Sequence, residues 1–191
     1  MGRDPNPRGA GDQLRAQLVA AASALLVDPQ SVSLPSLRAV ARACDVSPAA
    51  VYLHFDSVQA LTLAVLDAQL DELEAVIRAA VPRDSAPREQ LAALGESYAR
   101  WGLEHPGAYQ LVFESADRLD LPEREHERWS LIEEAAHMIV AETGASPDSA
   151  AATAVRLWTM LHGIVSLRIH KPQLPWAPVD GEVAEAITKF L

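Results

Sequence analysis

The stretch SLRAVARACDVSPAAVYLHF, residues 36–55, decides the fold. Ser36 can cap a short helix over residues 37–43. Ser47 followed by Pro48 is typical of a second helix start, because the serine oxygen accepts a free backbone N–H and proline has no N–H to leave unpaired. Three residues separate the two helices, which is the spacing of a helix-turn-helix. We therefore expect the start of the second helix, residues 47–50, to enter a DNA major groove.

On both sides of this stretch, apolar residues recur every three or four positions, and no long segment alternates with the period of two that strands require. The pattern predicts an all-α fold of nine helices. Besides the two short ones, they cover residues 14–28, 57–82, 87–105, 108–115, 120–144, 147–171 and 179–191. Asp56 and Gln59 have the spacing of a capping box for the fourth helix. The eighth helix is apolar over most of its girth, so it must be covered on more than one side.

Charge divides the chain into unequal parts. Overall, 16 Lys and Arg face 26 Asp and Glu, a net charge of −10. Residues 1–55 hold five Arg and four Asp, net +1, which leaves eleven cations and twenty-two anions, net −11, for residues 56–191. Because phosphate binding needs cations, a DNA-binding surface is expected only in the N-terminal part. We predict a flexible arm over residues 1–12, a DNA-binding domain over 13–56 and a second domain over 57–191.

Composition excludes several classes of protein. With 49% hydrophobic and 22% charged residues, the chain is not disordered as a whole. The single cysteine, Cys44, cannot form an intramolecular disulfide, which favours a reducing compartment and hence the cytoplasm. No long uninterrupted apolar run indicates a membrane span, and residues 1–12 have no apolar segment of a signal peptide.

Residues 37–55 contain the pattern L-R-x-V-A-x-x-x-x-V-S-P-x-x-V-Y-x-H-F, which resembles the TetR family of transcriptional repressors. The segments EHPGAYQLVFE (104–114) and LWTMLHGIVSLRI (157–169) further resemble a subgroup of that family named for a Trp-His-Gly signature. The resemblance implies a homodimer, a three-helix DNA-binding unit, and a C-terminal pocket whose small-molecule ligand releases the DNA operator.

The same resemblance implies DNA contacts along the two short helices. Arg38 would reach a guanine edge or a phosphate, and His54 would hydrogen-bond the DNA backbone. The remaining contacts would come from Ser47 and Tyr52, toward phosphates, and from Pro48, Ala49 and Ala50, whose apolar atoms suit a thymine methyl group. Other interpretations stay open: Arg38 as a solvated charge, Tyr52 as a core residue and His54 as a packing residue. Phe55 is assigned to the core.

Three residues depart from the family pattern. Asp45 stands in the turn where glycine is usual, Leu53 where a basic residue is common, and Val58 where a lysine is frequent. Two phosphate partners per protomer are therefore missing, unless Arg3, Arg8 and Arg15 compensate from the arm and first helix. An alternative function follows, in which a TetR-like dimer binds a ligand or protein but has lost operator binding.

Large side chains on inward helical stripes make up the predicted ligand pocket: Tyr98, Trp101, Tyr109, Phe113, Met138, Trp158, Leu161 and His162. They suit an apolar or aromatic molecule of moderate size. The eighth helix also carries a second seam, Leu157, Leu161 and Ile164, which we expect to form the two-fold interface together with the ninth helix. Gly163 permits close approach of another helix.

An enzyme is the remaining alternative. Glu123-x-x-His126 and Glu134-x-x-His137 have the spacing of carboxylate-bridged metal sites in helical bundles. Both pairs fall in a single helical region, and the first is charged on all sides, which is typical of a solvated face. No phosphate loop or nucleophile motif is present, so the sequence predicts no enzyme, metal or cofactor.

Overall fold

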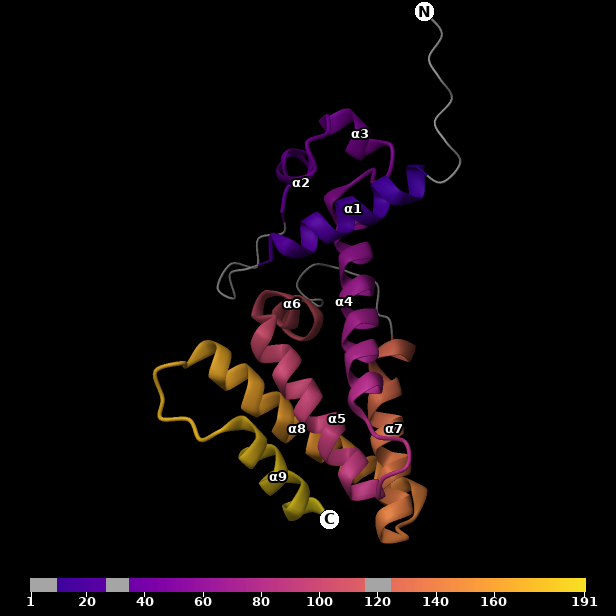
Figure 1. The fold of residues 1–191 in the computed structure, drawn as a ribbon, viewed down its shortest axis with the longest axis vertical. Coiled ribbons are helices and arrows are strands. Elements are labelled where there is room, and N and C mark those ends of the chain that lie inside the picture. Colours follow the sequence, from indigo (N-terminus) through magenta and orange to yellow (C-terminus); the bar gives the residue numbers. More distant parts are fainter. Residues whose placement is uncertain (1–9, 27–34, 116–124) are drawn as a thin grey trace, which may run out of the picture.

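The computed structural model describes residues 10–26, 35–115 and 125–191. These residues form nine α-helices and one short π-helix, with no strand among them, which confirms the all-α prediction. Figure 1 shows a small upper lobe joined by one long helix to a larger bundle. The elements are α1 (Ala10–Ala24), α2 (Leu37–Ala43), α3 (Pro48–Tyr52), α4 (Val58–Ala80), α5 (Pro87–Glu104), α6 (Pro106–Gln110), η1 (Leu111–Ser115), α7 (Glu125–Thr143), α8 (Pro147–His170) and α9 (Val179–Phe190).

The upper lobe consists of α1, α2 and α3. The serine caps predicted for α2 and α3 are both present: Ser36 Oγ accepts the Ala39 N–H and Ser47 Oγ accepts the Ala50 N–H, each at 3.2 Å. Val40 and Val51 are fully buried where the two helices meet. Phe55 is also buried, which confirms its place in the core. The lobe is therefore a helix-turn-helix packed on α1.

Helix α4 connects the lobe to the bundle and contributes to both cores (Figure 1). Its first half packs on α1, and its second half lies in the bundle against α5 and α7. The predicted capping box is wrong by one residue: Ser57, not Asp56, caps α4, with its Oγ accepting the Ala60 N–H at 3.0 Å. The apolar stripe itself is as predicted, since Leu66, Leu70, Leu73 and Ile77 are buried.

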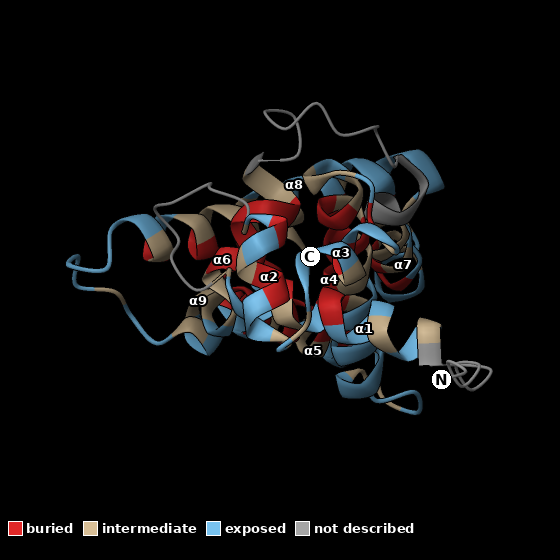
Figure 2. Ribbon diagram, turned by 90° about the horizontal axis from the view of Figure 1, so that it is seen from above, coloured by how far each residue is buried: buried red, intermediate tan, exposed pale blue. Residues whose placement is uncertain are grey.

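In the bundle, α5 contacts α4, α7, α8 and α9. Figure 2 shows the buried residues in the interior of the molecule and the exposed ones on its outside. Helix α8 is covered on one side only. Leu157, Leu161 and Ile164, the seam predicted to face a second subunit, are buried inside the protomer, so that assignment is wrong. The side that remains exposed carries Val155 and Leu167, 40% and 51% exposed.

By length and composition, α8 is the one helix among the described residues that could cross a membrane. The apolar residues on its inner side pack against α5, α7 and α9, while its outer side stays exposed. A single such helix, packed in this way, does not indicate a membrane protein.

Arg168 of α8 binds both the loop between α8 and α9 and the start of α9. Its side chain is 8% exposed, and its Nη1 lies 2.6 Å from Glu182 Oε2. Its Nη2 donates to the Ala177 carbonyl oxygen, and its guanidinium lies 5.0 Å from the centre of the Trp176 ring. One buried cation thus holds both the connecting loop and the first turn of α9.

Some boundaries differ from the prediction. Helix α1 begins at Ala10, so residues 10–12, assigned to the flexible arm, are helical. Helix α6 begins at Pro106 rather than Ala108, because proline needs no N–H partner at the first helical position. The predicted start of the seventh helix at Asp120 lies outside the described residues. Its end is confirmed, since Gly144 follows α7 with a φ of 68°.

Gly107, in the first turn of α6, touches the end of α1. A Cβ atom placed on this glycine would lie 1.7 Å from the Leu26 carbonyl oxygen and 2.6 Å from its carbonyl carbon. The neighbour is backbone, so it cannot give way as a side chain would. The residue therefore sets how closely the bundle approaches the upper lobe.

We predict that Gly107→Ala lowers the free energy of unfolding by about 2 kcal/mol or more, because overpacking against backbone forces elements apart. Chemical denaturation monitored by circular dichroism measures the change. Gly181→Ala is the matched control: its Cβ would meet nothing within 4 Å, so it should leave stability unchanged or raise it. Equal stability of the two variants would contradict the close contact between Gly107 and the Leu26 backbone.

Candidate DNA-binding and ligand-binding sites

The exposed surface of the upper lobe is formed by the start of α3 and the adjoining face of α2. Ser47, Pro48 and Ala49 are exposed and Ala50 is half-buried, so the predicted groove-facing residues lie together at one edge. Val51, the next residue, is fully buried and fixes the helix on α2. The Ser47 oxygen already caps the helix, which leaves its O–H free to donate to a phosphate.

The turn between α2 and α3 depends on Asp45. Its φ of 53° lies in the left-handed region, where aspartate is tolerated better than most residues with a side chain. The Val46 N–H then reaches back to the Ala41 carbonyl oxygen at 3.0 Å. The departure from glycine is thus accommodated, but it adds a negative charge next to the edge predicted to face DNA.

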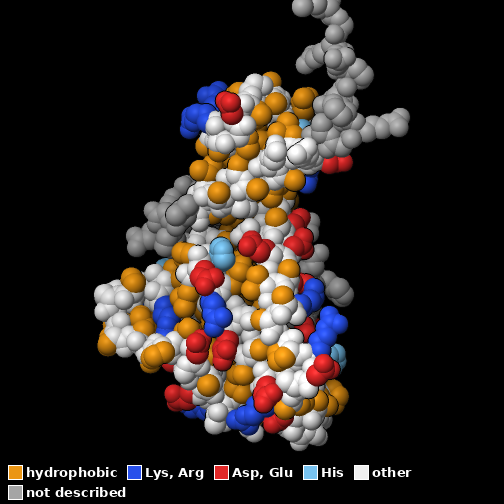
Figure 3. Space-filling model, viewed as in Figure 1, with side chains coloured by type: hydrophobic (Ala, Val, Ile, Leu, Met, Phe, Trp, Pro, Cys, Tyr) orange, Lys and Arg blue, Asp and Glu red, His pale blue; other side chains and the backbone are white. Residues whose placement is uncertain are grey.

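The other predicted DNA contacts have different surroundings. Arg38 is exposed on α2, and Tyr52 is 57% exposed at the end of α3, so Tyr52 is not a core residue. His54 is half-buried, and its Cε1 lies 3.9 Å from the position of a Cβ on Gly11, next to the start of α1. Figure 3 shows Lys or Arg side chains beside Asp or Glu side chains at one side of the tip of this lobe, and hydrophobic side chains over the rest of it in this view.

The departures from basic residues leave an apolar edge. Leu53 is 84% exposed directly after α3, and Val58 is half-buried at the start of α4. Arg15 is exposed on α1, with its Cζ 5.0 Å from the centre of the Phe55 ring. Arg3 and Arg8 lie outside the described residues. The described cations of the upper lobe are therefore Arg15 of α1 and Arg38 and Arg42 of α2.

A cavity lies inside the bundle, between α4, α5, η1, α7 and α8. Its enclosed volume is about 40 Å³, well below the roughly 300 Å³ or more of small-molecule sites, so a ligand of that size would have to displace lining side chains. Four of the predicted pocket residues line it: Tyr98, Phe113, Trp158 and Leu161. The other four do not. Met138 and Trp101 are core residues. Tyr109 and His162 do not line the cavity but contact the hydroxyl of Tyr98, which does belong to the lining.

The sequence did not indicate the remaining lining residues. They come from four helices and are mostly aliphatic: Leu70, Leu73 and Glu74 of α4, Leu94 of α5, Leu131, Ile132 and Ala135 of α7, and Ala154 and Leu157 of α8. An inward stripe marks these residues as buried but does not tell which of them border an open space. Ala135 of α7 and Ala154 of α8 help to explain the open space, because small side chains leave room where two helices face each other.

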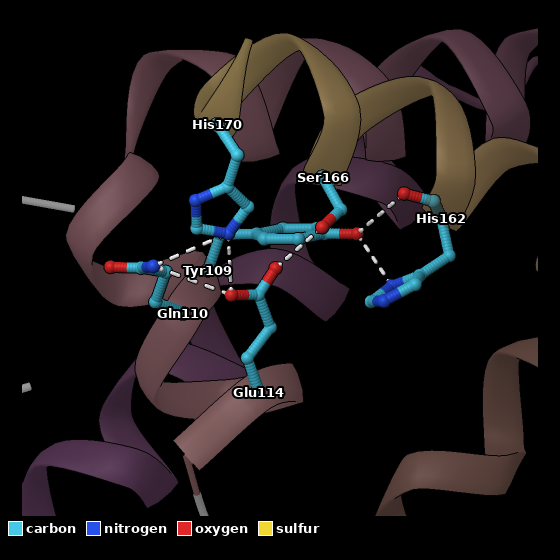
Figure 4. A network of polar contacts seen from close by, with 6 residues as sticks. All are labelled: Tyr109, Gln110, Glu114, His162, Ser166 and His170. Atoms are coloured by element: carbon cyan, nitrogen blue, oxygen red, sulfur yellow. Dashed lines mark hydrogen bonds and ion pairs between the residues drawn. The ribbon is translucent and has the colours of Figure 1, made fainter. Parts of the chain in front are cut away.

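Behind the cavity, three side chains form a chain of hydrogen bonds. The Tyr109 hydroxyl lies 2.6 Å from His162 Nδ1, and the Tyr98 hydroxyl lies 3.1 Å from that of Tyr109 (Figure 4 shows the Tyr109 end). The Trp158 side chain hydrogen-bonds the Tyr98 hydroxyl in turn. The polar partner that a buried His162 requires is therefore a pair of tyrosines.

Burial determines the protonation of this chain. It raises the pKa of both Tyr98 and Tyr109 far above the ordinary phenol range, so both keep their hydrogen. Burial also lowers the pKa of His162, although the negative charge of Glu114 opposes that shift. A neutral ring carries one hydrogen, and its tautomer sets whether Nδ1 accepts from the Tyr109 hydroxyl or donates to it; the same hydroxyl also lies 3.4 Å from the His162 carbonyl oxygen, to which it can donate.

A second set of polar contacts ties η1 to α8 (Figure 4). Glu114 accepts hydrogen bonds from Ser166 Oγ at 2.7 Å and from Gln110 Nε2 at 3.3 Å, and it lies 2.9 Å from His170 Nε2. Burial alone would raise the pKa of Glu114, but these partners outweigh burial and lower it. The carboxylate fixes η1, and with it Phe113, at the edge of the cavity.

Metal ligation finds no support in the described residues, where no three His, Cys, Asp or Glu side chains gather. Of the two predicted pairs, Glu123 lies outside the described residues. His137 is exposed and Glu134 half-buried on α7.

A helix-turn-helix with an exposed second helix, joined to a helical bundle that encloses an apolar cavity, defines a class of DNA-binding regulators that carry their own sensor domain. Residues 91–191 match the family model described as tetracycline repressor-like, C-terminal domain, so the match covers more than half of the chain. The chain belongs to this TetR family of transcriptional regulators, and it is a regulator rather than an enzyme. Its membership of the Trp-His-Gly subgroup stays a prediction.

Solved structures agree over nearly the whole length. A protein of unknown function from Rhodococcus sp. RHA1 is 28% identical, with a TM-score of 0.77 over 98% of this chain and 97% of that one. A TetR-like transcriptional regulator from the same organism is 19% identical, with a TM-score of 0.73 over 97% and 96%. The second likeness shows the fold alone.

A curated relative matches in part. The HTH-type transcriptional activator FasR of Mycolicibacterium smegmatis is 33% identical over 105 residues, which are 54% of this chain and 47% of the relative. The match thus spans about half the length of that protein. Its designation as an activator leaves the direction of regulation open for the present chain.

We predict that Leu53→Lys strengthens DNA binding and steepens its salt dependence. In a dimer the change adds two cations at the DNA edge, so the slope of log K against log salt should steepen by about 1.8. Fluorescence anisotropy with DNA from upstream of the gene, at several salt concentrations, measures this. Leu174→Lys, at a leucine 47% exposed between α8 and α9, is the control and should not change the slope. An unchanged slope for Leu53→Lys would show that residue 53 does not lie next to the DNA phosphates in the complex.

Proposed function

We propose that the chain is a homodimeric, ligand-responsive transcriptional repressor of the cytoplasm, released from its operator by a small apolar or aromatic molecule. The observation that carries this proposal is one continuous core that holds both a DNA-facing helix end and an apolar cavity. The DNA edge would be formed by Arg38, Ser47, Pro48, Ala49, Ala50, Tyr52 and His54. Double-stranded DNA, an effector and a second copy of the chain are the partners.

Two routes could carry a signal from the cavity to the lobe. Helix α4 lines the cavity with Leu70 and Leu73 and packs its other end on α1. Phe113 of η1 also lines the cavity, and Gly107 of the adjoining α6 meets the backbone of Leu26, two residues after the end of α1. A ligand that displaces Phe113 or the middle of α4 would therefore shift α1 and change the spacing of the two lobes in a dimer.

The exposed face of α8 supports a dimer. Val155, Thr159, Gly163 and Leu167 follow one another at intervals of four, and all are exposed except Gly163, which is half-buried. A Cβ on Gly163 would meet nothing within 4 Å in the protomer. Packing within the subunit therefore does not require a glycine at this position. A closely approaching helix of a second copy would explain it, with α8 and α9 of both copies forming a four-helix interface.

We predict that Gly163→Arg converts the dimer into a monomer, because the long charged side chain occupies the space where the second α8 would pack. Sedimentation velocity measures the mass, and circular dichroism checks that the subunit remains folded. Ala141→Arg, at an exposed alanine of α7, is the control and should remain dimeric. A dimer in both variants would move the interface away from this face.

Reporter expression from the chain's own upstream DNA tests the regulatory role without a known effector. Deletion of the gene should raise expression. We predict that Ala135→Phe, which fills the cavity from α7, keeps expression low and leaves DNA affinity within about twofold. Lower expression after deletion would indicate an activator. Absence of DNA binding at low salt, with no change in expression, would indicate the dimer that has lost its operator.

A further inference from the structure

The outward face of α3 is made of side chains that cannot read a base by paired hydrogen bonds. Fully buried Val51 fixes which way the helix is turned. The exposed residues are Ser47, Pro48, Ala49, Tyr52 and Leu53. Paired contacts to a base come from Arg, Lys, Asn or Gln, and Asp or Glu accepts from cytosine. The face of α3 includes none of these residue types.

Two hydroxyl groups are the polar side-chain atoms of this face. Ser47 Oγ accepts the Ala50 N–H at 3.2 Å as the helix cap, and the Tyr52 hydroxyl belongs to a side chain that is 57% exposed. A hydroxyl both donates and accepts, so it pairs with several base edges and does not select one. Within α2 and α3, selective hydrogen bonds to bases are therefore left to Arg38 and Arg42 of α2.

The rest of the face is hydrocarbon in contact with water. Pro48 and Ala49 are exposed at the end of α3 that is proposed to enter the groove, and Leu53 is 84% exposed at the other end. Covering such side chains with another apolar group removes their surface from water and is favourable. On the major-groove edges of the DNA bases, the apolar group is the C5-methyl of thymine. Docking of this end of α3 therefore favours positions where a methyl meets Pro48 or Ala49.

We infer that α3 selects operator bases through their C5-methyl groups, with Pro48 and Ala49 as specificity-determining residues, so that 5-methylcytosine can replace thymine and uracil cannot. This inference rests on the proposed DNA-binding function and deepens it. Uracil differs from thymine only in lacking this methyl, and methylation of cytosine at C5 adds a methyl at the same place in the groove. Each buried methyl strengthens binding by about fourfold. The operator then responds to cytosine methylation as well as to sequence.

The test replaces single base pairs of the bound site, which hydroxyl-radical footprinting locates in DNA from upstream of the gene. At a contacted position, thymine–adenine and 5-methylcytosine–guanine should bind within about threefold of each other. Uracil–adenine and cytosine–guanine should each bind about fourfold more weakly than the methylated pair, or about fifteenfold when both half-sites are changed. Fluorescence anisotropy with the full chain measures all four affinities. Equal binding of thymine and uracil at every position overturns the inference.

Variants assign the contact to α3. Ala49→Gly removes a methyl from the face and Pro48→Ala removes ring methylenes, so each should lower the thymine-to-uracil ratio of affinities toward one. Ala20→Gly makes the first of these changes at an exposed alanine of α1 and should leave the ratio unchanged. Circular dichroism checks that each variant is folded, and the base-pair comparison itself uses the unaltered chain. A ratio that survives both substitutions in α3 overturns the assigned residues, because it then arises from the shape of the DNA.

The outcomes separate this inference from the proposed function. Binding of the upstream DNA that is unaffected by uracil would support the DNA-binding function and contradict methyl selection. Absence of binding to this DNA at low salt would contradict both.

Discussion

The structure depends on the burial of one helix in two places. The first half of α4 supplies Leu61 and Val65 to the core beneath α1, and its second half supplies Leu70 and Leu73 to the bundle. A rigid helix of 23 residues cannot satisfy both cores unless lobe and bundle keep a fixed distance. The backbone contact between Gly107 and Leu26 sets that distance from a second side. A change in the bundle therefore reaches the lobe as a movement of whole helices.

Local signals predicted the DNA-binding lobe well because its helices are short and capped. The bounds of α2 and the Ser47 cap follow from residues within four positions of each other. Where two neighbours could both cap, as Asp56 and Ser57 can, the sequence does not decide between them. Only the backbone angles of the turn select Ser57.

The cavity and the interface were harder to predict because they depend on distances between helices. Helix α8 is apolar on nearly all sides, so its sequence does not tell which face meets α5 and which stays open; the seam Leu157, Leu161 and Ile164 turned inward. The bond between Tyr109 and His162 joins residues 53 positions apart. Helical spacing identifies buried residues, but an open space between them depends on the sizes of side chains from several helices.

The uneven division of charge has a consequence for how the protein searches a genome. Residues 56–191, net −11, are repelled by phosphates, while the lobe of residues 1–55 is only weakly positive. Affinity for random DNA is mostly electrostatic, so encounters with it are brief. Weak binding to random DNA is the expected result, because that binding draws its affinity from Lys and Arg. The protein must rely on shape and apolar contact with the correct site to remain there.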